Sequence, residues 1–142
     1  MQTAAEILRI KGNEVWSVEP DDTILNAIKL MAEHQIGALL VMEDSKPVGI
    51  VTERDYARKV ALENRSSKDA LVREIMSTRV LCARPDQTVK ECMALMSDKR
   101  ARHLPVLDHK KVIGIISIGD LVKSIIEEQQ FEIEALQYYI TH

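Results

Sequence analysis

Two short motifs in this chain place a hydroxyl three residues ahead of a carboxylate. The first, "GIVTERD", spans residues 49–55, and the second, "GIISIGD", spans residues 114–120. A hydroxyl and an acid at this spacing match a capping box, in which both side chains bind backbone N–H groups at the start of a helix. One hypothesis is therefore that the motifs only begin two helices. The residues concerned are Thr52 with Asp55, and Ser117 with Asp120.

The same motifs also suit a nucleotide. A strand that runs straight into a helix leaves N–H groups and a partial positive charge at the helix start, which favours phosphate. A carboxylate one turn into the helix can accept hydrogen bonds from both hydroxyls of a ribose. Gly49 and Gly114 lack a Cβ atom, which would let a flat base approach the backbone. Capping and nucleotide binding both stay open at this point.

The two motifs belong to a longer internal repeat, which decides the architecture. A shift of 65 residues superimposes Pro20 on Pro85 and Asp55 on Asp120, with no gap between these limits. In each copy, apolar residues at helical spacing follow a "PDDT" or "PDQT" sequence, whose aspartate is expected to start the helix. Two apolar runs joined by a polar turn then predict a hairpin, and a second helix begins at the motif.

Each copy therefore reads β-α-β-β-α, and the fold class is expected to be α+β. Short strands are predicted at 15–18 and 80–83, and second helices at 53–64 and 119–130. The polar segment 63–69 reads as a linker. The last helix is expected to continue through residues 131–140, where an apolar stripe suits either a partner surface or packing against the same module.

The repeat and its motifs resemble a pair of CBS domains, the Bateman module, over nearly the whole chain. On this resemblance, residues 1–142 form one module with repeats at 4–64 and 70–128 and a helical extension at 129–142. The resemblance implies that the repeats pack about a pseudo-two-fold axis. It also implies clefts for adenosyl ligands such as AMP, ADP, ATP, NAD(H) or, less favoured, S-adenosylmethionine.

The resemblance also implies which residues bind, with the motif of one copy facing the strand start of the other. One predicted site contains Thr52, Arg54 and Asp55 with Arg102, His103, Leu104 and Pro105. The other contains Ser117, Gly119 and Asp120 with Gly37, Ala38 and Leu39. Position 37 is glycine where the second copy has Arg102, so Lys11, in an expected longer loop, is the candidate phosphate cation there.

Composition excludes several other classes of protein. The net charge of −3 argues against a chain that coats nucleic acid or a membrane, and no apolar run has the length of a membrane span. We expect a cytoplasmic location. Cys82 and Cys92 lack metal-ligand spacing and are expected to be packing residues, as is Trp16. The four histidines lack paired spacing, so no metal site is predicted.

The prediction is a regulatory sensor that binds an adenine nucleotide, forms a homodimer and passes occupancy to a regulated protein partner. A ligand-free dimerisation or interaction scaffold is the alternative. An enzyme is disfavoured because the sequence has no P-loop, paired catalytic carboxylates or nucleophile–base pattern.

Overall fold

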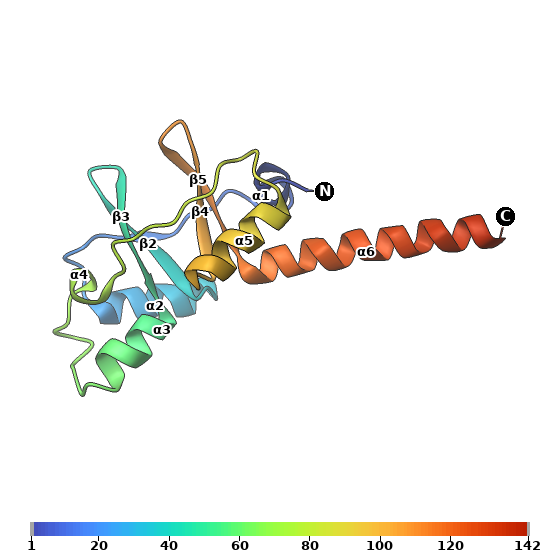
Figure 1. Ribbon diagram of the computed structural model, residues 1–142. Coiled ribbons are helices and arrows are strands. Elements are labelled where there is room, and N and C mark those ends of the chain that lie inside the picture. Colours follow the sequence, from blue (N-terminus) through green and yellow to red (C-terminus); the bar gives the residue numbers. More distant parts are fainter. Residues whose placement is uncertain (1, 142) are drawn as a thin grey trace. The chain divides into compact units, whose positions relative to one another are not determined.

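The structure is a computed structural model that describes residues 2–141, and it is a mixture of helices and two small sheets (Figure 1). This confirms the predicted α+β class. The helical elements are α1 (Ala4–Lys11), α2 (Ile24–His34), α3 (Glu53–Tyr56), the π-helical turn η1 (Ala57–Ala61), α4 (Val72–Ile75), α5 (Val89–Lys99) and α6 (Ile118–Thr141). The strands are β1 (Ser17–Val18), β2 (Ala38–Glu43), β3 (Lys46–Thr52), β4 (His103–Asp108) and β5 (Lys111–Ser117).

The chain divides into two compact units that do not follow the order of the sequence. The central unit contains residues 14–80, with the sheet β1-β2-β3. The terminal unit contains residues 2–13 and 81–141, with the sheet β4-β5. Helix α1, which precedes the first repeat in sequence, therefore packs in the unit of the second repeat, where it contacts β5. Helix α4 correspondingly contacts β3 of the central unit.

The two hairpins have the same geometry, as the repeat predicts. Strands β2 and β3 are antiparallel, as are β4 and β5, and each pair has its irregularity at the equivalent place. Both turns place two consecutive non-glycine residues in the left-handed region, which is the geometry of a type I′ turn. These residues are Asp44 and Ser45 in one hairpin, and His109 and Lys110 in the other.

The first helix of each copy begins at a threonine and not at the aspartate that the sequence suggested. Thr23 accepts the N–H of Asn26 at the start of α2, and Thr88 accepts that of Glu91 at the start of α5. Asp22 instead accepts the N–H of Glu19 in the preceding turn, at 2.8 Å. A threonine oxygen reaches the third helical N–H as readily as an aspartate oxygen does. The sequence therefore predicted where each helix begins but not which residue caps it.

Three other expectations need correction. The strand predicted at 80–83 is reduced to a single bridge between Ala83 and Val106, whereas its counterpart forms β1. The helix predicted at 53–64 changes from α3 to the π-helical η1 and ends at Ala61. Trp16 is an exposed residue whose ring stacks on His34 with centroids 3.6 Å apart, so it is not a core residue.

Each unit has its own hydrophobic core built from the inner faces of its helices and hairpin. The terminal core includes residues of α1, α5, β4 and α6, and it contains Cys92, which is fully buried as predicted. Burial also raises the pKa of the Cys92 thiol, and this keeps it in the unreactive protonated form. The central core is formed in the same way by α2, β2, β3, η1 and α4.

Candidate nucleotide-binding site

Both hydroxyl–carboxylate motifs lie at the junction where a hairpin ends and a helix begins. Strand β3 ends at Thr52 and α3 begins at the next residue, whereas β5 ends at Ser117 and α6 follows directly (Figure 1). We call these the Thr52–Asp55 junction of the central unit and the Ser117–Asp120 junction of the terminal unit. The predicted direct passage from strand to helix is therefore present in both copies.

The carboxylates at both junctions form capping boxes. Asp55 Oδ2 accepts the N–H of Thr52 at 2.9 Å, and Thr52 Oγ1 accepts the N–H of Asp55 at 3.1 Å. The corresponding distances between Ser117 and Asp120 are 2.8 and 3.2 Å. The structure thus confirms that both motifs cap a helix. A carboxylate can accept about four hydrogen bonds. Capping through one oxygen uses only part of this capacity, so the carboxylate can still accept a hydrogen bond from a ligand.

The start of each hairpin lies beside the junction of its own copy. In the central unit, Ala38 pairs with Thr52, and the N–H of Glu53 donates to the carbonyl of Gly37 at 3.1 Å. In the terminal unit, the N–H of Ile118 donates to the carbonyl of Arg102 at 2.8 Å. His103 pairs there with Ser117. The pairing of these residues across copies, which the resemblance implied, stays a prediction.

The candidate residues differ in how much surface they offer. Leu39 and Leu104 are fully buried in the cores of their units. Ala38 and Pro105 are also buried. Of the remaining candidates, the exposed ones are Lys11, Arg54, Arg102 and Gly119, while Gly37, Thr52, Asp55, His103, Ser117 and Asp120 are half-buried.

The two motif glycines serve packing and not the approach of a base. A Cβ atom on Gly114 would lie 2.5 Å from Cδ2 of Leu8, and one on Gly49 would lie 2.6 Å from Sδ of Met76. The space beside each glycine is therefore filled by a side chain from the end of α1 or from the residue that follows α4. The suggestion that a flat base reaches the backbone on this side is wrong.

The Ser117–Asp120 junction is bordered by cations. Lys11 Nζ lies 2.7 Å from Asp120 Oδ2 and 2.7 Å from the carbonyl oxygen of Ile115. Lys11 is the last residue of α1 and not part of a loop, but it does reach the predicted junction. Burial by itself would raise the pKa of Asp120, because it disfavours the charged carboxylate. The hydrogen bonds from Lys11 and Ser117, with the charge of Lys11, outweigh this effect and hold the pKa of Asp120 below its usual value.

His103 responds to the same charges. Burial and the positive charge of Lys11 lower its pKa, Asp120 opposes them, and Arg102 adds to the lowering. The imidazole is therefore neutral at pH 7. An anion placed among Lys11, Arg102 and His103 would favour protonation of the ring. The terminal junction thus holds two cationic side chains, Lys11 and Arg102, whose charges act on the half-buried His103.

The Thr52–Asp55 junction has a different electrostatic environment. Lys59 Nζ lies 3.3 Å from Asp55 Oδ1 and donates to the carbonyl of Ile75 at 2.9 Å. The carboxylate of Glu53 lies beside Gly37, where an added Cβ would be 3.0 Å from it. Sequence reasoning did not single out Lys59 or Glu53. The spacing of Asp55 and Lys59, four residues apart in a predicted helix, could have revealed the ion pair.

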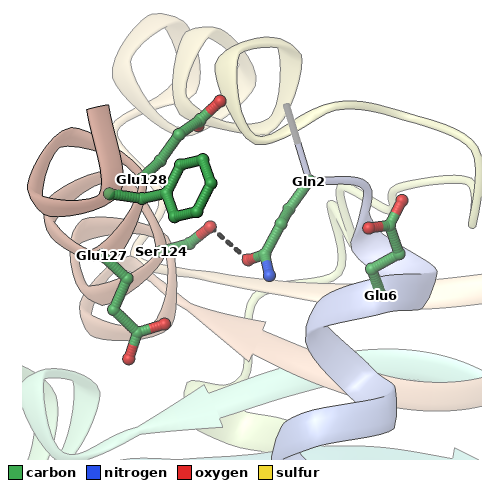
Figure 2. Close-up of a pocket in the computed structure, with 6 residues that line it drawn as sticks. Gln2, Glu6, Ser124, Glu127 and Glu128 are labelled. Atoms are coloured by element: carbon green, nitrogen blue, oxygen red, sulfur yellow. Dashed lines mark hydrogen bonds between the residues drawn. The ribbon is translucent and has the colours of Figure 1, made fainter. Parts of the chain in front are cut away.

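A separate hollow of about 310 Å³ lies on the terminal unit (Figure 2). Ser124 and Gln2 point toward each other there, and the serine hydroxyl donates to the Gln2 amide oxygen. The hollow is lined by Gln2, Glu6, Ser124, Glu127, Glu128 and Phe131, none of which is a predicted site residue. Within residues 2–141, no three His, Cys, Asp or Glu side chains are grouped so that they could hold a metal ion.

The comparison with protein families decides which family has this repeated junction. The family model for the CBS domain matches residues 4–62 and again residues 72–127. The chain belongs to the CBS-domain family. This confirms the resemblance on which the site residues were predicted, and both matched CBS domains contain one of the two junctions.

Individual CBS-domain proteins are similar over most of the chain. CBS domain-containing protein CBSX3, mitochondrial, from Arabidopsis thaliana is 38% identical over 97% of this chain and 71% of its own length. A protein with CBS domains from Burkholderia ambifaria MC40-6 is 55% identical, with a TM-score of 0.86 over 90% of this chain and 96% of that structure.

One solved structure in the family contains adenosyl ligands. The CBS domain pair of protein MJ0100, in complex with 5′-methylthioadenosine and S-adenosyl-L-methionine, is 25% identical to this chain. Its TM-score is 0.79, over 90% of this chain and 98% of that structure. Within residues 2–141, no helix has the length and apolar character needed to cross a membrane.

Proposed function

We propose that this chain is a regulatory module that binds an adenosyl nucleotide through Asp55 and Asp120 and transmits occupancy to a protein partner. The observation that carries the proposal is the repeated junction, in which a half-buried carboxylate caps a helix directly after a strand. The adenosyl ligands bound to MJ0100 support the ligand class. AMP, ADP, ATP and NAD(H) are the preferred candidates, and S-adenosylmethionine is less favoured.

Each carboxylate would accept hydrogen bonds from the ribose hydroxyls while it continues to cap its helix. A hydrogen bond to a charged acceptor contributes about 1.5–3 kcal/mol. At the terminal junction, Lys11, Arg102 and His103 would face the phosphates, and the first turn of the long helix α6 adds favourable N–H dipoles. At the central junction, Thr52 and Asp55 would bind the sugar with Arg54 nearby, whereas Glu53 disfavours a phosphate next to Gly37.

The other candidate residues complete the proposed site through their backbones and shape. Leu39 and Leu104 would hold the hairpin starts in position from within the cores, and Ala38, Pro105 and Gly119 would offer main-chain atoms and small surfaces. Occupancy can change a partner's binding only if the ligand has unequal affinity for two conformations of the module. We propose regulation of this kind, in a homodimer, with no reaction catalysed.

Ligand binding is tested by calorimetry and thermal denaturation of the full chain with AMP, ATP, NADH and S-adenosylmethionine. A compound at a hundred times its dissociation constant should stabilise the protein by about 2.7 kcal/mol. Asp55→Asn and Asp120→Asn keep an oxygen that can accept the capping N–H but remove the charge. Each should therefore lose one binding event, while the ligand-free protein should lose no more than the contribution of one ion pair, about 1 kcal/mol.

A matched control is available in α5, where Thr88 and Glu91 form a capping box that belongs to neither junction. Glu91→Gln makes the same chemical change and should leave ligand affinity unaltered. If no compound binds the wild type, or if Glu91→Gln weakens binding as much as Asp120→Asn, the nucleotide proposal is wrong.

The second candidate is a ligand-free scaffold for dimerisation or interaction. The completed capping boxes favour it, because they explain both carboxylates without a ligand. This function would be selected if none of the four compounds binds and if none of them changes the self-association of the protein. The cytoplasmic location stays a prediction.

A further inference from the structure

The exposed apolar residues of α6 include a regular seam along its length. These residues alternate at spacings of four and three, the pattern that places side chains on one face of a coiled coil. The five apolar residues of the seam have exposed fractions of 41–84%, and its single glutamine is exposed as well. The seam consists of Val122, Ile126, Gln129, Ile133, Leu136 and Ile140.

The seam is distinct from the face by which α6 packs in its own unit. Leu121 and Ser124 are the buried residues of the helix, and from residue 129 to 141 every side chain is exposed. Ser124 faces Gln2 across the hollow of the terminal unit (Figure 2). At 3.6 residues per turn, this buried face lies a little over a third of a turn from the seam. Packing within the unit therefore leaves the seam uncovered.

We propose that α6 forms a parallel, two-stranded coiled coil with α6 of a second copy of this chain. In heptad terms, isoleucine occupies all three a positions, at 126, 133 and 140, while Leu136 occupies a d position. Isoleucine at a with leucine at d favours two parallel strands. Gln129 is at a central d position. Two such amides can hydrogen-bond to each other only when the helices are parallel and in register, so Gln129 specifies both.

The charges beside the seam also favour an identical partner. In a parallel pair, Glu132 at position g faces Gln137 at position e of the second copy, so no like charges meet. An antiparallel pair centred on the same region would place Glu132 against the Glu132 of the second copy. The other acidic residues of this segment, Glu127, Glu128 and Glu134, occupy b and c positions on the outside of the pair.

The test compares self-association of variants at two neighbouring residues with equal exposure. Leu136 is 63% exposed and lies on the seam, whereas Tyr138 is 61% exposed and lies on the other side of the helix. Leu136→Glu should weaken the dimer by at least about tenfold in sedimentation equilibrium of the full chain. Tyr138→Glu should leave it unchanged. Neither substitution touches a core, so both variants should keep the circular dichroism of the folded protein.

Orientation is tested by disulfide formation in the full chain. Gln129→Cys should cross-link two copies under mild oxidation, because d positions face each other in a parallel pair. Phe131→Cys, on the far side of the helix, should not. A monomeric wild type, or a dimer insensitive to Leu136→Glu, would overturn the proposal and leave the seam for a different protein partner. Equal weakening by both glutamate variants, or equal cross-linking of both cysteine variants, would also overturn it.

Discussion

Replacing Gly114 by alanine tests whether the motif glycines exist for packing or for a ligand. The new Cβ atom would lie 2.5 and 2.8 Å from the two methyl carbons of Leu8. Since comfortable contact needs about 3.5–4.0 Å, Leu8 would have to retreat by about 1 Å. Leu8 is only 3% exposed and belongs to the core of the terminal unit, so it has no space into which to move.

The expected cost combines two opposing contributions. Overpacking of a close-packed core costs about 1–3 kcal/mol, and the tight contact here suggests the upper half of that range. Replacing glycine by alanine in a strand also stabilises the protein by about 0.5–1 kcal/mol, because the unfolded chain then has less conformational entropy to lose. Gly114→Ala should therefore destabilise the ligand-free protein by about 1.5–2 kcal/mol. At about 4 °C per kcal/mol, the thermal midpoint should fall by roughly 6–8 °C.

Two matched glycines should respond differently. The neighbour of Gly49 is Met76, which is flexible and only partly buried, although the carbonyl of Ser77 lies 3.0 Å from the added Cβ, so Gly49→Ala should cost about 1 kcal/mol. At Gly119 the nearest atom would be 3.6 Å away, which is ordinary contact. Because this glycine lies in α6, Gly119→Ala should stabilise the protein by up to about 0.5–1 kcal/mol.

The measurement is thermal and urea unfolding of the three alanine variants without ligand. A double-mutant cycle with Leu8→Ala assigns the cost to the contact, since Gly114→Ala should be nearly harmless once the leucine methyl groups are gone. An unchanged midpoint for Gly114→Ala, or a cost that persists undiminished beside Leu8→Ala, would refute the packing argument.

Three further predictions concern local features. Ser45→Gly should stabilise the protein by about 0.5–1 kcal/mol in urea unfolding, because its φ of 65° suits glycine in a type I′ turn; no gain would contradict that turn assignment. Thr88→Ala should destabilise it by about 1 kcal/mol, through loss of the α5 cap, and a neutral result in the same assay would argue against this cap. Lys11→Met should cost about 1 kcal/mol at neutral pH. Since the pKa of Asp120 is lowered in the folded state, this difference should persist above about pH 4 and disappear as acid protonates the carboxylate. A difference that is constant from pH 2 to pH 7 would exclude the ion pair as its cause.

Local features of the fold could be predicted because they depend on residues close in sequence. The 65-residue shift predicted two equivalent hairpins, and the structure has them with matching turns and matching irregularities. The spacing of Thr52 and Asp55 predicted a capping box, which the backbone of a single turn is enough to form. The identity of the helix cap at Thr23 was missed because aspartate and threonine both satisfy the same N–H group.

The candidate site could be predicted only in part. Its two junctions were found from motif and repeat, but the cation beside Asp120 comes from Lys11, which is 109 residues away in sequence. Leu8 fills the space beside Gly114, and this contact also joins residues that are far apart in the sequence. No local pattern links these residues, because side-chain contact between distant segments depends on how helices pack on sheets.

The sequence by itself determined the two equivalent hairpins, through the 65-residue repeat, and the carboxylate at each strand-to-helix junction, because a capping box needs only residues of one turn. Only the tertiary structure decided that α1 packs on β5 of the second repeat. A duplicated chain contains two equivalent sheets, and the periodic pattern of a helix fits either one. The choice is made by the whole set of packing contacts around residues such as Leu8 and Lys11, which exists only in the folded molecule.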